Sequence, residues 1–179
     1  MTTYLALLRG INVGGNSLIK MADLKLALAQ SGLQNVRTYI QSGNVVFESE
    51  ATDTLVLAQE VSKSIKNHFK MDVQTVVFSK KQWSGIIATA PKWWGADKEW
   101  KHNLLVMIPP FTMPEIVAAV GQLKPDIEAM QPGNGVLYQS MSLKLFGRTT
   151  TGKLASNPVY KQMTIRNYNT ATKLVKIMD

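Results

Sequence analysis

Apolar and polar residues in the first half of the chain follow the two-residue period of strands at some points and the wider spacing of helices at others. The pattern predicts strands over Thr3–Leu8, Val36–Gln41, Val45–Ser49 and Val73–Phe78, and helices over Met21–Gln30 and Asp53–Phe69. The tight-turn sequence Ser42-Gly43-Asn44 separates the middle two strands and predicts a hairpin. The order strand, helix, strand, strand, helix, strand is that of a ferredoxin-like unit.

The second half of the chain repeats this order. Strands are predicted over Asn103–Ile108, Ile127–Met130, Val136–Phe146 and Thr164–Arg166, and helices over Met113–Leu123, Lys153–Met163 and Thr170–Met178. The Asn157-Pro158 pair must break or restart the second of these helices. We therefore predict an α+β fold of two tandem ferredoxin-like units with antiparallel sheets and an added C-terminal helix. The alternative is one merged α+β sheet.

The two units are expected over residues 1–90 and 102–179, with a tryptophan-rich connector over 91–101, all within one compact body. Three of the four tryptophans stand in or beside this connector: Trp93, Trp94 and Trp100. Tryptophan usually packs, which favours a connector pinned onto the core. The alternative is an aromatic platform beside neighbouring lysines that stacks a base or a sugar.

Composition excludes several classes of protein. The 179 residues include 20 Lys and Arg, 12 Asp and Glu, 45% hydrophobic residues and no Cys, with a formal net charge of +8. A chain without Cys has no disulfide scaffold, no Cys nucleophile and no thiolate zinc site. The two histidines, His68 and His102, are far apart in sequence. We expect neither a metal site nor a cofactor.

Membrane and export signals are also missing from the sequence. The longest apolar runs are far shorter than the ~20 residues of a membrane-spanning helix. The N-terminus lacks a basic segment, and Arg9 ends its apolar run. We therefore expect a cytoplasmic protein with no membrane partner.

Positive charge is concentrated near the C-terminus. The segment from Ala129 to Met178 contains no acidic residue and seven basic ones: Lys144, Arg148, Lys153, Lys161, Arg166, Lys173 and Lys176. Such a segment attracts anions, because no local carboxylate offsets its potential. It predicts either a face that binds nucleic acid or a solvated basic face with no ligand.

Two glycine-rich loops resemble phosphate-binding loops without completing the pattern. The loop from Gly10 to Ser17 has the frame G-x-x-x-x-G-x-S, but Asn16 stands where the essential Lys belongs. The loop from Gly147 to Leu154 has the Lys, but its last residue cannot bind Mg²⁺ as Ser or Thr would. Each loop is therefore either a cradle of backbone N–H groups for an anion or a simple glycine-rich connection.

Other candidate groups are sparse. Asn167 and its neighbours offer N-caps for the last helix, and Arg166 beside a helix N-terminus favours an anion. The carboxylates are scattered, and the pair Asp126 and Glu128 is interpreted as a solvated strand edge. Nothing identifies a general base, so the sequence leaves open whether the protein is an enzyme.

Three segments together resemble a known family. They are Ala6–Gly15 (ALLRGINVGG), Thr38–Phe47 (TYIQSGNVVF) and Thr164–Asn167 (TIRN). The chain is similar to the bacterial domain-of-unknown-function 1697 family over essentially its whole length. The resemblance implies a duplicated ferredoxin-like fold, and it supplies no activity, cofactor or catalytic residue. It also implies that the three segments act together as one site.

We predict that the protein binds a small anionic ligand, phosphorylated or carboxylated, in a basic pocket formed by the glycine loops. The candidate ligand-binding residues are Arg9, Gly14, Gly15, Ser42, Asn44, Lys153, Arg166 and Asn167. The first alternative is a nucleic-acid-binding module that uses the basic C-terminal face. The second is an interaction protein with no ligand. The oligomeric state is left open.

Overall fold

The computed structural model describes residues 1–14, 18–110 and 113–179, together with every side chain in these ranges except those of Lys153 and Ala155. The chain divides into two compact units. The first comprises Met1–Ser84 with Leu174–Asp179, and the second comprises Gly85–Lys173.

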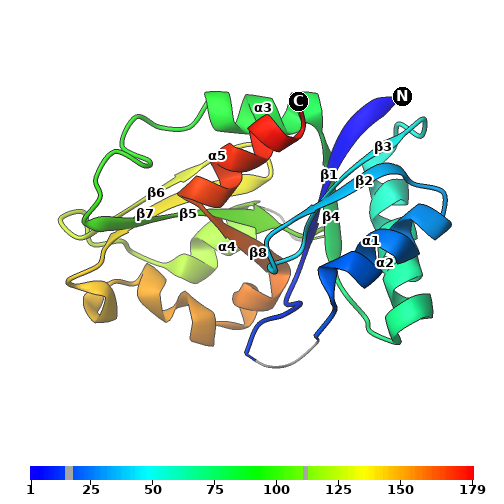
Figure 1. Ribbon diagram of the computed structural model, residues 1–179. Helices are drawn as coiled ribbons and strands as arrows, with labels where there is room; N and C mark the ends of the chain where they lie inside the picture. Colours follow the sequence, from blue (N-terminus) through cyan, green and yellow to red (C-terminus); the bar gives the residue numbers. More distant parts are fainter. Residues whose placement is uncertain (15–17, 111–112) are drawn as a thin grey trace. The chain divides into compact units, whose positions relative to one another are not determined.

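The first unit contains a four-stranded antiparallel sheet. Its strands are β1 (Thr2–Leu8), β2 (Gln34–Tyr39), β3 (Asn44–Ser49) and β4 (Thr75–Ser79), in the order β2-β3-β1-β4. The helices α1 (Met21–Gln30) and α2 (Thr54–Phe69) cover one face of this sheet (Figure 1). The predicted strands and helices of this half are all present, with ends shifted by at most two residues.

From Tyr4 onward, every second side chain of β1 packs into the core beneath these helices. Tyr4, Ala6 and Leu8 share a cluster with residues from both helices, among them Leu24 of α1 and Val61 of α2. The Asp53 carboxylate caps α2 by accepting hydrogen bonds from the N–H groups of the second and third residues after it. Such a cap satisfies donors that the first helical turn leaves unpaired.

The second unit contains another four-stranded antiparallel sheet. Its strands are β5 (Trp100–Met107), β6 (Glu128–Pro132), β7 (Val136–Ser142) and β8 (Met163–Asn167), in the order β6-β7-β5-β8. One face carries a core in which Leu105 and Leu137 of the sheet pack with Ile116 of α4 (Met113–Val120). The strands form two sheets, so the alternative of one merged sheet is wrong.

Two helical segments differ from the sequence prediction. In place of a helix over Lys153–Met163 there are short 3₁₀ segments, Thr151–Ser156 and Pro158–Gln162, after another at Phe146–Arg148. Asn157 is extended and its side chain caps the segment that begins at Pro158, so the predicted break is present. The helix α3 (Lys80–Ala88) was not predicted.

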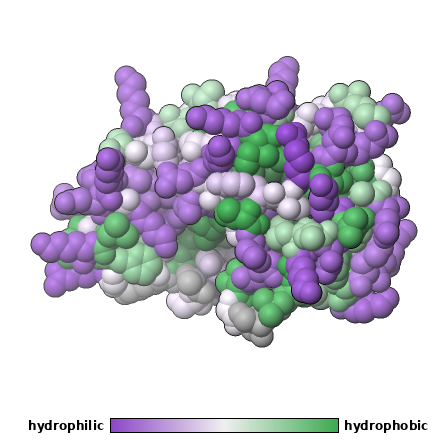
Figure 2. Space-filling model, in the orientation of Figure 1, coloured by the Kyte–Doolittle hydropathy of each residue, from purple (hydrophilic) through white to green (hydrophobic). Residues whose placement is uncertain are grey.

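The last helix, α5 (Tyr168–Ile177), agrees with its prediction to within two residues. Within residues 1–14, 18–110 and 113–179, no helix is long and apolar enough to span a bilayer. Hydrophilic residues predominate over the face in Figure 2, with hydrophobic side chains between them.

Candidate functional site

The first glycine loop is tied to the β2–β3 turn by one side chain, that of Asn12. Its Nδ2 donates to the carbonyls of Ile19 (2.9 Å) and Gln41 (3.0 Å), and its Oδ1 accepts from the Ile19 N–H at 2.7 Å. Asn12 has a positive φ of 55°, which asparagine tolerates better than most residues. Asn12 was not among the candidate residues predicted from the sequence, although an Asn between glycines is a signal of such a turn.

The Ser42-Gly43-Asn44 turn packs directly against the end of β1. The Leu8 N–H donates to the Gly43 carbonyl at 2.8 Å, and a Cβ on Gly43 would lie 2.7 Å from the Cβ of Leu8. Asn44 is fully buried, and its Nδ2 donates to the Tyr39 carbonyl (2.9 Å) and to Ser42 Oγ (3.1 Å). The first two family motifs therefore lie together, and these contacts hold the hairpin turn in shape.

The remaining candidates of the first unit lie along the same loop. Arg9 is half-buried, and its backbone N–H donates to the Gln74 carbonyl at 2.9 Å. Gly14 is exposed with a φ of +64°. Gly15 lies outside the described residues.

The second glycine loop already holds an anion, which is the carboxylate of Glu128. The Thr150 N–H donates to Oε1 at 2.9 Å, while the Thr151 N–H and hydroxyl donate to Oε2 at 2.9 and 2.7 Å. Lys124 adds its backbone N–H to Oε1 at 3.0 Å. Glu128 is only 1% exposed, so its interpretation as part of a solvated edge is wrong. The side chain of Lys153, also on this loop, lies outside the described part of the chain.

The charge of Glu128 is stabilised where it lies. Burial alone would raise the pKa of this carboxyl, but the hydrogen bonds from Thr151, Thr150 and Lys124 outweigh burial and lower its pKa below the ordinary value of 4.5. Glu128 therefore stays ionised at neutral pH.

The third family motif divides into a buried and an exposed residue. Arg166 is 4% exposed, and its Nη1 donates to Thr164 Oγ1 (2.8 Å) and to the Ile165 carbonyl (2.9 Å). Burial lowers the pKa of the Arg166 guanidinium to about 10, which leaves it charged at neutral pH. Asn167 is exposed, and its Oδ1 accepts from the Thr170 N–H at 2.8 Å. It therefore caps α5, as the sequence indicated.

A hollow of 730 Å³ opens beside this cap, within the second unit. We call it the α5 hollow, and it is lined by Gly95, Asp97, Lys98, Trp100, Lys101, His102, Leu143, Asn167, Tyr168 and Asn169. Connector residues, the start of β5 and the N-terminus of α5 thus contribute to one concave surface. Among the predicted ligand-binding residues whose positions the structure describes, Asn167 alone lines it.

Tyr168 forms one wall of the α5 hollow and is held firmly. Its ring packs edge-on against the buried Trp94, with centroids 4.9 Å apart, and against His102 at 6.3 Å. Gly95 has a φ of +89°, and a Cβ there would overlap the Tyr168 ring. Trp94 is thus a buried core residue, whereas Trp100 lines the hollow.

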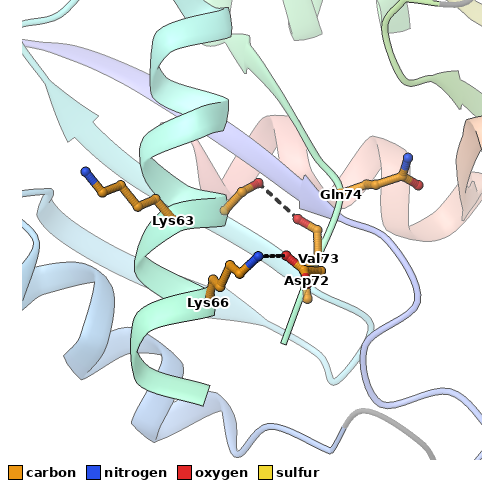
Figure 3. Close-up of a pocket in the computed structure, with 6 residues that line it drawn as sticks. Lys63, Lys66, Asp72, Val73 and Gln74 are labelled. Atoms are coloured by element: carbon orange, nitrogen blue, oxygen red, sulfur yellow. Dashed lines mark hydrogen bonds and ion pairs between the residues drawn. The ribbon is translucent and has the colours of Figure 1, made fainter. Parts of the chain in front are cut away.

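Two other hollows lie in the first unit, and in each some of the lining side chains already pair with one another. In one, of 390 Å³, Lys66 pairs with Asp72 at 2.7 Å, and Ser62 donates to the Val73 carbonyl. Figure 3 shows the Lys63 side chain and the Gln74 side chain extending in opposite directions from α2 and from the segment before β4. In the other, beside β2, Glu48 already accepts a hydrogen bond from the Asn35 amide.

Comparison with known proteins identifies the family to which the chain belongs. A family model described as "Protein of unknown function (DUF1697)" matches residues 1–138. The chain belongs to this family. The DUF1697 match ends within β7, so the second glycine loop and the third motif lie beyond it. No curated protein matches the chain.

A solved structure extends the likeness to the rest of the chain. The conserved bacterial protein SP0830 from Streptococcus pneumoniae is similar with a TM-score of 0.88 and 27% sequence identity, over 99% of each chain. The resemblance stated from the sequence is therefore confirmed at the level of the family, whose own description assigns no function.

Proposed function

We propose that the protein binds a small anionic ligand, phosphorylated or carboxylated, in the α5 hollow. The observation that carries this proposal is that two lysines, Lys98 and Lys101, line the same concave surface as the N-terminal residues of α5. Ammonium groups and the positive end of a helix dipole both favour negative charge. A volume of 730 Å³ also lies within the range of small-molecule sites.

The charges that face the α5 hollow are unequal. Lys98 and Lys101 are both exposed, and the only carboxylate among the lining residues is that of Asp97. One Asp97 oxygen, Oδ1, accepts a hydrogen bond from the Glu99 N–H at 2.8 Å. The first turn of α5 contains no acidic residue. The balance therefore favours an anion over a cation.

The test is a titration of the full chain with inorganic phosphate, followed by backbone amide shifts in NMR. We expect shifts at Lys98, Lys101 and Asn169, and a Kd that rises by up to ~5-fold in Lys101→Gln, since an exposed charge pair contributes about 1 kcal/mol at most. The matched control is Lys161→Gln, which removes an exposed lysine that does not line the hollow. Equal affinity in the two variants, or no shift at the hollow, overturns the proposal.

The single pocket predicted from the sequence joins residues of both units and stays a prediction. Arg9→Gln in the same titration tests it, because that pocket requires the response at Gly14 to disappear. If Gly14 responds to phosphate identically in wild type and variant, Arg9 has no part in binding.

Nucleic-acid binding through the basic C-terminal face is the second candidate. Lys144, Arg148 and Lys161 are exposed, which supports it, whereas Arg166 is buried and engaged within its own strand. For a polyanion, log K of binding would fall steeply with the logarithm of the salt concentration, by roughly 0.7–0.9 per phosphate contact.

The cytoplasmic location also stays a prediction.

We further propose that the two sheets are tandem ferredoxin-like units produced by internal duplication. The support is their shared strand order: β2-β3-β1-β4 in the first and β6-β7-β5-β8 in the second. The first unit has both crossing helices, whereas 3₁₀ segments replace the second helix in the other. An experimental structure in which the two sheets superpose strand for strand would test this.

A further inference from the structure

The α5 hollow has an aromatic side as well as a cationic one. Trp100 and Tyr168 line it and are both half-buried. Next to it, Phe146 is 41% exposed, and the Lys101 ammonium lies 5.6 Å from the centroid of its ring. Exposed aromatic rings interleaved with lysines are the combination that binds a nucleobase and its phosphate together.

His102 lines this hollow, and neither nitrogen of its imidazole is available to a ligand. Its Nε2 lies 2.6 Å from the Asp97 carbonyl oxygen, which only accepts, so Nε2 carries a proton. Its Nδ1 lies 2.6 Å from Ser140 Oγ, the residue directly opposite on β7. A phosphate in the α5 hollow would therefore meet the lysines, because both His102 nitrogens are already engaged.

The aromatic side is also fixed before any ligand arrives. Tyr168 packs between Trp94 and His102, and Trp94 is itself anchored by donating its Nε1 hydrogen to the Asn103 carbonyl at 2.9 Å. Rings held in this way lose little conformational entropy when a flat ligand stacks on them. Inorganic phosphate or a simple carboxylate would use none of this surface.

We infer that the anionic ligand is a nucleoside phosphate, with its base on the aromatic side formed by Trp100 and Tyr168 and its phosphate at Lys98 and Lys101. This inference rests on the proposed function of the same hollow. Two kinds of ligand present a base together with a phosphate: a free mononucleotide and one nucleotide of a single strand.

The experiment compares AMP with ribose 5-phosphate, which has the same phosphate and sugar but no base. Stacking of one base on an aromatic side chain predicts that AMP binds roughly 5- to 150-fold more tightly. If AMP and ribose 5-phosphate bind equally, the inference of a nucleoside phosphate is wrong and the proposal of a small anionic ligand stands. If neither binds at millimolar concentration, the proposed function fails as well.

Variants of Trp100 locate the base. Trp100→Leu should abolish the preference for AMP over ribose 5-phosphate, and Trp100→Phe should keep most of it, because only the second retains a ring. Val117→Ala is the control for a change at an exposed apolar side chain outside the hollow, and it should keep the preference, since Val117 is 42% exposed on α4 and is not among the lining residues. A preference for AMP that is unchanged in Trp100→Leu overturns the inference.

A ten-nucleotide adenine single strand separates the two kinds of ligand. Affinity more than 10-fold above that of AMP, with a steep loss on adding salt, assigns a strand to the hollow. Affinity equal to that of AMP assigns the free nucleotide. Weaker binding of the strand than of ribose 5-phosphate would contradict both forms of the inference.

Discussion

Replacing Glu128 with Gln tests whether the second glycine loop is closed by the chain's own carboxylate. The substitution keeps the size of the side chain and converts one buried oxygen into an N–H donor. Both carboxylate oxygens already face donors: the N–H groups of Lys124 and Thr150 at Oε1, and the N–H and hydroxyl of Thr151 at Oε2. The amide of Gln therefore places a donor against a donor in either orientation.

The orientation of the Gln amide that costs least sets the expected loss of unfolding free energy. With the amide nitrogen at the Oε2 position, the Thr151 hydroxyl can rotate and accept, but the buried Thr151 N–H is left without its acceptor. A hydrogen bond to a charged group contributes about 1.5–3 kcal/mol, and the remaining bonds lose their charge assistance. We expect the free energy of unfolding to fall by roughly 2–4 kcal/mol, and Tm to fall by about 5–15 °C.

The assay is urea and thermal unfolding of Glu128→Gln at pH 7, with Asp126→Asn as the matched control. Asp126 is exposed, so its variant should differ from wild type by less than about 0.5 kcal/mol. Because the folded pKa of Glu128 lies below 4.5, its stabilisation is present above pH 4.5 and is lost as the pH falls through the folded value. The gap between wild type and Glu128→Gln should therefore narrow below pH 4.5. Two results would refute the reasoning. One is a loss of unfolding free energy in Glu128→Gln no larger than that in Asp126→Asn, and the other is a loss that stays constant down to pH 3.

Glycine and asparagine positions give two further predictions. Gly95→Ala should lower the free energy of unfolding, measured by urea titration, by about 1–3 kcal/mol, because its Cβ would overlap the Tyr168 ring and its φ is positive. Gly85 lies within α3 with open space around it, so Gly85→Ala should raise the free energy of unfolding by about 0.5–1 kcal/mol in the same titration. A destabilised Gly85→Ala or a neutral Gly95→Ala would contradict this account of the two sites. Asn12→Ala should cost about 1–3 kcal/mol and increase amide hydrogen exchange at Ile19, since that N–H loses its side-chain acceptor; unchanged exchange would show that the Asn12 bridge does not hold the loop.

Local patterns in the sequence were sufficient for most of the elements. The hairpin around Gly43 follows from turn chemistry, and α1 and α2 follow from apolar spacing that ends at the observed residues or beside them. The antiparallel pairing of both sheets follows from the order of the elements, because a hairpin and two crossing segments allow few other arrangements. These features depend on neighbours in sequence, which a single chain shows directly.

The helix α3 was missed although a signal for it was present. The Ser79 N–H donates to Gln82 Oε1 at 2.8 Å and the Gln82 N–H donates to Ser79 Oγ at 3.3 Å, which is a reciprocal capping pair. The pattern Ser-x-x-Gln begins at the last residue of β4 and is visible in the sequence. Gly85 inside a nine-residue segment weakened the helical pattern, and the buried Trp83 compensates for it by packing.

The candidate site could not be predicted because its partners are distant in sequence. A loop with converging backbone N–H groups needs an acceptor, since buried donors without one are costly. The sequence shows the donors at Thr150 and Thr151, but not that Glu128, 22 residues before Thr150, supplies the oxygens. An anion-binding pattern is therefore satisfied internally as readily as by a ligand. The α5 hollow differs, since Lys98 and Lys101 line it with Asp97 as the only carboxylate among the lining residues. That difference moves the ligand hypothesis from the second glycine loop to the hollow.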